Sequence, residues 1–572
     1  MKTAGLFAGR LIRPKTALVL TLVLFVAFLT VPPLVALIVG ALTNNSPIEP
    51  LVFSLRPLQE SYTRSETYSS LARSVAFSVL VATAVLVVGA FLSWLVERTD
   101  SSIRYFTNAF TMIPLMVPAV LLISGWIMLL NPRNGMINQL LIDYLGFDGP
   151  VFDIYSFWGM VWVATLQELP LGFLWLWPAF RTMNPVFEEA AVVSGASLLT
   201  TLRRVVLPIM RPALLSGWMI FFIYAMGMLA VPLMIGLPSK IFFYSTEIYL
   251  VTKRYPADLN LAGAYCLLLL FVTLIGISMY WRWTKRIERF ATITGKGFRP
   301  RRISLGYWQP VVTSFAVLLL MLLAGLPLLV LMWNAFMPYP QIPSWPSLQQ
   351  ATLENFVEAW NYGPTTRAVT NSIGLGIAAG VISTVFGVVA AWCILRYDTH
   401  RRLIEFIDVM ATAPIAVPGL IVGVSLVWLY LYIPLPIYGT HWILLIAYVT
   451  LHLPYSVRIC TAALTQVHRE MDEAAEVSGA SWLRILMRII IPLTAQGIIV
   501  SILYVTLRSF REYAASIFLT GVGTEVFSVL VLDMWSAGAQ NVLAAYASVV
   551  ALLLGALILA MTWLSSRMGV RL

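Results

Sequence analysis

The segment Glu189-Ala-Ala-Val-Val-Ser-Gly-Ala-Ser197 recurs in the second half of the chain as Glu473-Ala-Ala-Glu-Val-Ser-Gly-Ala-Ser481. Eight of the nine residues are identical at an offset of 284 positions, and the same offset relates Pro208 to Pro492. Shared apolar composition can explain matching Leu and Val residues, but it does not explain matching Glu, Ser and Gly residues. The two halves of the chain are therefore predicted to be repeats of one structural unit.

The repeat extends toward the N-terminal side of this segment at a slightly larger offset. Trp94, Asp100, Pro114 and Pro118 match Trp392, Asp398, Pro414 and Pro418 at offsets near 300. The difference between the two offsets predicts about 16 extra residues in the first half, within 131–155.

The composition of the chain indicates a membrane protein. Of its 572 residues, 59% are hydrophobic and 11% are charged, and the mean hydropathy is +0.85, whereas ordinary globular chains are about a quarter charged. So few charges cannot cover a water-exposed surface, which excludes soluble enzymes, nucleic-acid binders and disordered scaffolds. The net charge of +11 lies in short loops between apolar runs. The three cysteines lie within apolar stretches and indicate buried thiols (Cys266, Cys393 and Cys460).

Twelve apolar runs are long enough for transmembrane helices, which need about 20 residues. The first six runs are 17–41, 70–96, 105–130, 156–181, 211–236 and 260–283, and the second six are 308–335, 367–395, 405–433, 441–464, 493–516 and 542–566. Barrel strands would be shorter and would alternate in polarity. The predicted fold class is therefore all-α, with two six-helix repeats. The first run is longer than the apolar core of a cleavable signal sequence, so we interpret it as a retained helix.

The basic residues predict the orientation of the chain. Seven Lys and Arg residues against one Glu lie between 284 and 302, and cytoplasmic loops carry the excess of such residues. We expect this segment and both chain termini to be cytoplasmic, although the same residues would also suit a lipid-binding patch on that side. Residues 284–306 are interpreted as a linker between a first repeat, 1–283, and a second, 307–572. An even number of spans in each half makes the repeats parallel.

Each copy of the repeated segment lies between the fourth and fifth predicted spans of its half. Residues 184–208 and 468–492 have the pattern of a polar helix, a glycine turn and a second short helix, which leads to a proline at the start of the next span. Such a helix–turn–helix suits insertion into a groove on a partner protein. The alternative is a helix on the membrane surface that packs its Ala face on the bundle.

The pattern Glu-Ala-Ala, three residues and Gly, followed later by a hydrophobic residue and Pro, resembles the EAA loop of permease subunits in bacterial ABC importers. A single chain with two such loops resembles the fused type I permeases of ferric-iron importers, with relatives for thiamine and phosphonates. Residues 507–513 and 523–526 resemble the ferric branch more weakly. The resemblance implies a multi-pass protein of the bacterial inner membrane that forms a solute path by alternating access, with polyamine and sulfate permeases as alternatives.

The resemblance also implies partners for the chain. Each EAA loop would be a coupling helix seated in a cleft of a cytoplasmic ABC ATPase homodimer, and an extracytoplasmic solute-binding protein would deliver the solute. One fused chain would supply both permease halves. The residues assigned to coupling are Glu189, Ala190, Ala191, Gly195, Glu473, Ala474, Ala475 and Gly479. The two glutamates would pair with a basic residue of the ATPase, and the two glycines would form the bend.

The chain contains no Gly-x-x-x-x-Gly-Lys-Ser/Thr sequence, the phosphate-binding loop of such ATPases. We therefore expect a transport protein and not an enzyme, with ATP and Mg²⁺ bound by the partner ATPase. No cofactor or metal site is expected on this chain, because its His and Cys residues lack metal-ligand spacing.

Ionisable residues within the spans are candidates for the translocation path, because charge at membrane depth is costly. Glu168 and His452 occupy matching positions at the 284 offset. They could face each other as a gate or pair to hold the halves together. A structural hydrogen bond beside Pro170 and Pro454 is the favoured role.

Three further charges lie toward the outer end of the eleventh predicted span. Arg508, Arg511 and Glu512 could receive an anionic or anion-chelated solute, and their first-half counterparts are Tyr224, Gly227 and Met228. A local Arg508–Glu512 ion pair, spaced i, i+4, is the slightly favoured alternative.

An ion-coupled secondary transporter is the main rival, because such carriers also have twelve spans in two parallel halves. It would need coupling carboxylates in its core, for which Glu168 is the one obvious candidate, and it would leave the duplicated loops without a purpose. A membrane-embedded enzyme would need a convergent catalytic set, which the sequence does not show.

Overall fold

The long apolar runs of the sequence form long helices. The computed structural model describes residues 14–45, 47, 49–107, 113–114, 117–287, 303–397, 401–433 and 435–567. Within these residues all regular structure is helical, apart from isolated bridges that join Thr43 to Phe53 and Thr99 to Ile303. The all-α prediction is confirmed. The basic residues at 289–302, the chain termini, Asp398 and His400 lie outside the described residues.

The helices of the first half alternate between long segments and short connecting pieces. They are α1 Pro14–Ala41, α2 Arg56–Thr63, α3 Ser65–Arg98, α5 Ala119–Leu130, α6 Met136–Leu145, α7 Phe157–Thr182, α8 Val186–Val193, α9 Leu198–Thr201, α10 Leu207–Met226, α11 Tyr244–Lys253 and α12 Leu259–Ile287. The helix α6 lies in the region where the repeat offset predicts an insertion.

The second half follows the same order. Its helices are α13 Gln309–Leu320, α14 Leu326–Ala335, α15 Trp345–Gln349, α16 Glu354–Asn361, α17 Thr365–Arg396, α18 Arg401–Thr412, α19 Gly419–Tyr432, α20 His441–Leu464, α21 Glu470–Val477, α22 Trp482–Ile485, α23 Ile491–Leu493, α24 Ala495–Phe510, α25 Ser516–Leu519, α26 Phe527–Ser536 and α27 Gln540–Arg567. Short π-helical turns at Leu202–Val206 and Leu486–Ile490 occupy matching positions in the two halves.

Eight described helices are long and apolar enough to cross a membrane, or up to ten if two bent helix pairs each count as one span. The bent pairs are Arg401–Ile415 with Gly419–Tyr432, and Trp482–Leu493 with Ala495–Phe510, with bends of 105° and 75°. Of the other predicted spans, 105–130 includes residues outside the described part and contains α5, and 542–566 lies within α27. The predicted span 211–236 lies too far along the chain, because the span in the structure is Leu198–Met226 and α10 ends at Met226, before Gly227 and Pro232.

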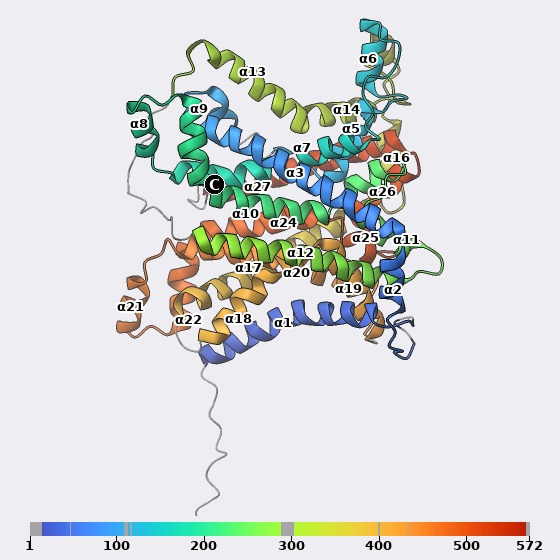
Figure 1. Cartoon of the computed structure of the whole chain (residues 1–572). Helices are drawn as coiled ribbons and strands as arrows, with labels where there is room; N and C mark the ends of the chain where they lie inside the picture. Colours follow the sequence, from blue (N-terminus) through green and yellow to red (C-terminus); the bar gives the residue numbers. More distant parts are fainter. Residues whose placement is uncertain are drawn as a thin grey trace, which may run out of the picture.

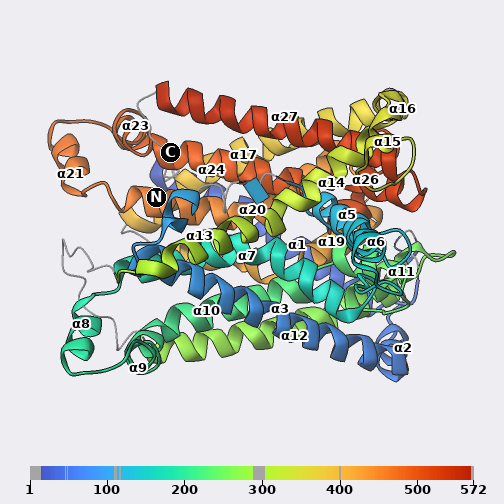
Figure 2. The ribbon, with the colours of Figure 1, turned by 90° about the horizontal axis from the view of Figure 1, so that it is seen from above.

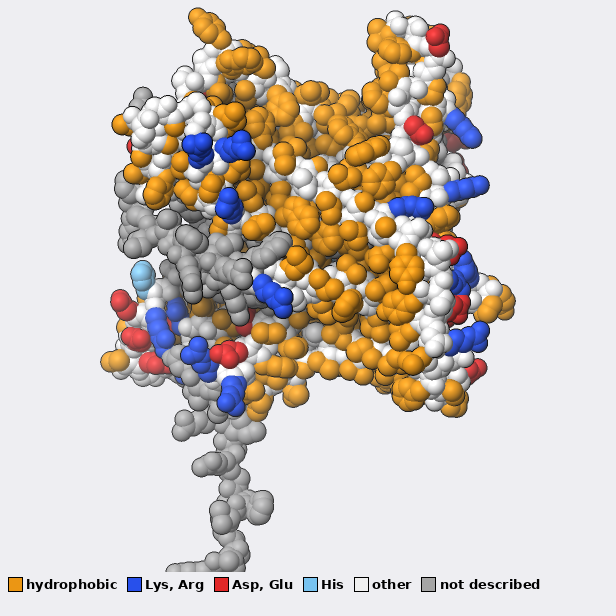
Figure 3. Space-filling model, viewed as in Figure 1, with side chains coloured by type: hydrophobic (Ala, Val, Ile, Leu, Met, Phe, Trp, Pro, Cys, Tyr) orange, Lys and Arg blue, Asp and Glu red, His pale blue; other side chains and the backbone are white. Residues whose placement is uncertain are grey.

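The long helices lie side by side along one direction (Figures 1 and 2). The helices α8, α9, α21 and α22 lie at one end of this bundle, and α2, α6, α11 and α16 lie at the other. The first residues of α1 and the last residues of α27 lie at the end that carries α8 and α21. Hydrophobic side chains cover the middle of the face shown in Figure 3, and the charged side chains gather toward its two ends, as a membrane-spanning bundle requires.

The first helix of each half packs against the opposite half. The helix α1 runs along α19, and α14 runs along α5. The ring of Phe25 in α1 stacks on Phe386 in α17, with the ring centres 3.5 Å apart. These exchanged helices join the two repeats into one body.

Candidate functional site

The two predicted coupling segments have the same local geometry. The helices α8 and α21 are each followed by a glycine, Gly195 or Gly479, with a φ angle of +80°. This left-handed conformation is readily available only to glycine. Each turn leads to a short helix, α9 or α22, and then to the π-helical turn that enters the next span. Both segments therefore form a helix–turn–helix that projects from the same end of the bundle (Figure 1).

A buried arginine binds each of these helices to the end of a long helix. Nε of Arg98, at the end of α3, lies 2.9 Å from Oε1 of Glu188, and the Arg98 side chain is 1% exposed. Nη2 of Arg98 also donates a hydrogen bond of 3.0 Å to the carbonyl oxygen of Met183. Burial raises the pKa of Glu188, and the Arg98 charge opposes that rise. The ion pair thus connects α8 to the span that precedes it in the bundle.

The second half repeats this connection with different residues. Nε of Arg396, at the end of α17, lies 2.7 Å from Oδ2 of Asp472 in α21, and both side chains are largely buried. Nη2 of Arg396 donates to the carbonyl oxygen of Val467. Asp472 and Val467 are the counterparts of Glu188 and Met183 at the 284 offset. The same attachment therefore occurs on both coupling segments.

Each attachment also contacts the residues that lead into the first helix of the opposite half. The backbone N–H of Ile303, ahead of α13, donates to the carbonyl oxygen of Arg98 at 2.9 Å. In the second half, Nζ of Lys15 at the start of α1 lies 3.4 Å from Oε1 of Glu476 in α21. The exchanged helices α1 and α13 are thereby joined to the coupling segments.

The predicted coupling residues lie on the outer surface of these helices. Glu189, Ala190, Glu473 and Ala474 are exposed, whereas Ala191 and Ala475 are partly buried. Oε1 of Glu473 lies 3.6 Å from Nε of Arg469, one helical turn earlier, and the corresponding residue of the first half is Pro185. The carboxylates of Glu189 and Glu473 are thus available on the surface.

Large apolar side chains are exposed beside these carboxylates at matching positions. Val193 and Val477 are 88% and 90% exposed, and they precede the two glycine turns by two residues. The pairs Phe187 with Met471 and Leu199 with Leu483 are also exposed. Exposed apolar patches rimmed by charge are typical of protein interaction sites.

The predicted path residues come together inside the bundle, around Arg508. The guanidinium carbon of Arg508 in α24 lies 5.5 Å from the ring centres of both Tyr224 in α10 and Tyr455 in α20. Glu168 in α7 and His452 in α20 lie within electrostatic reach of the same guanidinium. Among the described residues no hydrogen bond or ion pair joins Glu168 directly to His452, and Arg508 is the neighbour that they share.

The slightly favoured Arg508–Glu512 ion pair is wrong. Among the described residues, no ion pair within 4 Å joins these two side chains, and Oε1 of Glu512 instead accepts a hydrogen bond of 3.0 Å from the backbone N–H of Ala515. The reason is that α24 ends at Phe510. Glu512 therefore lies beyond the helix, where the i, i+4 relation no longer holds. Arg511, at the end of the same helix, is partly buried and lies within electrostatic reach of Glu168.

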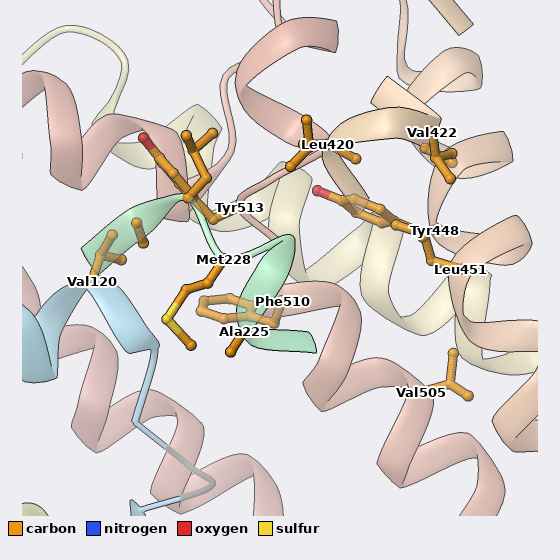
Figure 4. Close-up of a cluster of buried hydrophobic side chains, with 14 of the residues drawn as sticks. Val120, Ala225, Met228, Leu420, Val422, Tyr448, Leu451, Val505, Phe510 and Tyr513 are labelled. Atoms are coloured by element: carbon orange, nitrogen blue, oxygen red, sulfur yellow. The ribbon is translucent and has the colours of Figure 1, made fainter. Parts of the chain in front are cut away.

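Apolar side chains from both halves pack together on the side of Arg508 that faces away from the coupling helices. Figure 4 shows Ala225 and Met228 of the first half beside Phe510 of the second. We call this group the apolar seal; its members are Val120, Ala225, Met228, Leu420, Phe510 and Tyr513, all buried. Phe510 and Ala225 follow closely in the chain on Arg508 and Tyr224, so the seal adjoins the contact between these two residues.

Sequence reasoning missed the residues that hold these sites together. Arg98 and Arg396 match at the same offset as Trp94 and Trp392, and Glu188 and Asp472 match at 284. Both residues of the ion pair thus have a charged counterpart of the same sign in the second half. This recurrence is a sequence signal that could have identified the ion pair. Tyr455 carries no such signal, because its first-half counterpart is Leu171.

Comparison with known proteins gives a consistent result. The family model described as binding-protein-dependent transport system inner membrane component matches residues 85–289 and again residues 383–570. The chain is 25% identical to the ferric transport system permease protein FbpB of Actinobacillus pleuropneumoniae, over 95% of this chain and 77% of that protein. It is 24% identical to the putative ferric transport system permease protein FbpB 1 of Haemophilus influenzae, over 90% of this chain and 79% of that protein. The spermidine/putrescine permease PotC of the same organism is 25% identical over 41% of this chain and 88% of its own length.

Proposed function

Because this chain belongs to the family of binding-protein-dependent transport system inner membrane components, we propose that its two halves form the membrane path of an ATP-driven importer for ferric iron. The observation that carries the proposal is the pair of matching helix–turn–helix segments at one end of the bundle, each with an exposed carboxylate and an exposed valine. A transporter driven by a symmetric motor needs two equivalent contact points, one on each half.

We assign α8 and α21 to contacts with a cytoplasmic ATPase dimer, which would bind ATP and Mg²⁺. The exposed Val193 and Val477 would enter apolar clefts of the two ATPase subunits, and Glu189 and Glu473 would pair with basic residues at their rims. With this assignment we expect the start of α1 and the end of α27 to be cytoplasmic, because they lie at the same end as α8 and α21. The opposite end would face the solute-binding protein.

We propose ferric iron as the solute because of the relatives that align with almost the whole chain. Two relatives that align over nine-tenths of it or more are ferric permeases, whereas a polyamine permease and a sulfate permease align over less than half of it. Thiamine, phosphonate, polyamine and sulfate are the alternatives that a transport assay would separate.

The mechanism follows from the attachments at Arg98 and Arg396. When ATP binding closes the ATPase dimer, the two coupling helices move toward each other. Arg98 transmits this movement from α8 to α3, and Arg396 transmits it from α21 to α17. The two halves then reorient, so that access to the polar residues around Arg508 alternates between the two ends.

The test uses the double variant Glu189→Ala plus Glu473→Ala in proteoliposomes with the ATPase and the binding protein. We expect ATP-driven uptake of radioactive iron to be lost or the ATPase to dissociate. Glu405→Gln, which removes an exposed carboxylate outside α8 and α21, is the control and should leave uptake unchanged. Normal uptake and normal assembly in the double variant would contradict the assignment. Uptake that an ionophore abolishes while ATP is held constant would instead indicate a secondary transporter.

A further inference from the structure

The contact between Arg508 and Tyr224 identifies the axis that relates the two halves. These residues are counterparts at the 284 offset, and the guanidinium carbon lies 5.5 Å from the Tyr224 ring centre. Two equivalent positions can lie this close only where the pseudo-twofold axis passes between them. The path formed by two parallel repeats follows this axis, so Arg508 lies on the path.

The residues around Arg508 leave several polar atoms without protein partners. Oε2 of Glu168 and both ring nitrogens of His452 are buried and have no hydrogen-bond partner among the described residues, and the two side chains are 3% and 2% exposed. The faces of the Arg508 guanidinium are covered by Tyr224 and Tyr455, and in the described part of the chain no carboxylate lies within 4 Å of it. Buried polar groups are normally paired, so these atoms are candidates for binding a ligand.

Several side chains around this polar group keep exposed surface inside the bundle. Tyr224 is 37% exposed, although Arg508 of the opposite half lies against its ring, and Ala225, the next residue, is 3% exposed. Tyr455, Tyr504 and Arg508 are likewise partly exposed. The exposed parts of these side chains lie where the two halves meet at the axis, and we take them as the surface that a solute contacts.

We propose that this group binds ferric iron as a complex with an oxyanion, and not as a bare ion. The in-plane donors of a guanidinium match the oxygens of a carboxylate or phosphate, and the free oxygen of Glu168 is a hard ligand suited to a trivalent cation. Arg508 and Arg511 would repel a bare cation, whereas Glu168 would repel a free anion. A ferric complex avoids both repulsions, because it presents its metal to Glu168 and its anionic oxygens to Arg508. This inference rests on the proposed ferric function.

Binding is measured on the purified full chain with its ATPase, using ferric citrate labelled on both iron and citrate, with ferric pyrophosphate as a second arm. We expect iron and citrate to bind together, and citrate alone to bind at least about tenfold more weakly. Arg508→Gln should weaken binding of the complex by roughly tenfold or more, because charge-assisted hydrogen bonds are lost. Arg508→Lys keeps the positive charge but not the planar set of donors. Its affinity for the complex should lie between those of the wild type and Arg508→Gln. Equal binding of citrate with and without iron, or wild-type affinity in Arg508→Gln, would overturn the proposal.

A matched control separates this site from general effects of removing an arginine. Arg458 lies in the same half, on α20, and its Nη2 lies 3.1 Å from Oδ1 of Asp408. Arg458→Gln should bind ferric citrate as the wild type does. A measurement of iron uptake then separates the proposed ferric function from the proposed binding site around Arg508. A wild-type complex that imports no iron contradicts the ferric function, whereas iron import that is unchanged in Arg508→Gln contradicts this site alone.

Discussion

Arg98 and Glu188 form an ion pair of 2.9 Å in which the arginine side chain is almost completely buried. The pair joins α8, the first of the two proposed coupling helices, to the last residue of the 34-residue helix α3. Its counterpart in the second half, Arg396 with Asp472, uses an aspartate in place of the glutamate. The attachment is therefore retained in both repeats although one residue of the pair differs.

Replacing Arg98 with Gln should destabilise the chain and uncouple ATP hydrolysis from transport. Loss of one partner of a buried ion pair costs about 3–5 kcal/mol, because the other charge remains buried and unpaired. We expect a lower melting temperature of the detergent-purified complex, and in the folded fraction ATP hydrolysis that continues while iron uptake falls. The measurement is the ratio of iron imported to ATP hydrolysed in proteoliposomes.

Arg401→Gln is the matched control for that experiment. Nε of Arg401 lies 3.0 Å from Oε1 of Glu405, but the two side chains are 89% and 63% exposed, and exposed pairs contribute little. Its melting temperature and transport ratio should match the wild type. If Arg98→Gln also kept the wild-type ratio, α8 would not transmit movement through this ion pair.

Replacing Gly195 or Gly479 with Ala should disturb the turn after each coupling helix. Both glycines have a φ of +80°, where a residue with a side chain is disfavoured by about 1–2 kcal/mol. We expect weaker ATPase binding, measured by co-purification, and a larger loss in the double variant. Gly363→Ala is the control, because Gly363 has open space around it and no positive φ. Equal co-purification of the single, double and control variants would contradict a structural role for the turns.

The sequence predicts the repeat, the helical class and the coupling segments, because each depends on local patterns. Glu189 and Glu473 stand in motifs nine residues long, and the spans follow from runs of apolar residues. The span at 211–236 is predicted to end too late, because the residues after Gly227 stay apolar although α10 ends at Met226.

Contacts between distant residues could not be predicted in the same way. The Arg508–Glu512 ion pair is predicted from i, i+4 spacing, which requires an uninterrupted helix. The helix α24 ends at Phe510, before Glu512, so the predicted pair does not form. Arg508 instead contacts Tyr224 and Tyr455, which precede it by 284 and 53 positions. Only the packing of α10, α20 and α24 brings these three residues together.

The contact between Arg508 and its counterpart Tyr224 predicts that a single substitution lowers stability more than an exchange of the two residues does. Tyr224→Arg alone places two guanidinium groups at the axis, and we expect it to lower stability by about 1–3 kcal/mol, because neither charge gains a partner. The exchange variant Tyr224→Arg plus Arg508→Tyr restores one arginine and one tyrosine, and should melt above the single variant. Thermal melting of the purified chain checks the order. A double variant that melts below Tyr224→Arg would show that the two positions do not face each other.

The outer-end carboxylate Glu525 should stabilise the chain in a manner that depends on pH. Its partial burial alone would raise its pKa, but a hydrogen bond from the backbone N–H of Gly523 and the charge of Arg367 outweigh burial and lower the pKa below its ordinary value of 4.5. Because the folded state favours the ionised form, the stabilisation is fully present above pH 4.5 and is lost as the pH falls through the lowered pKa. Glu525→Gln should therefore lower the melting temperature at pH 7, and the difference from wild type should shrink in buffers below pH 4.5. Glu405→Gln, which breaks only an exposed ion pair, should show little difference at either pH, and a Glu525→Gln effect that grew on acidification would contradict the assigned sign.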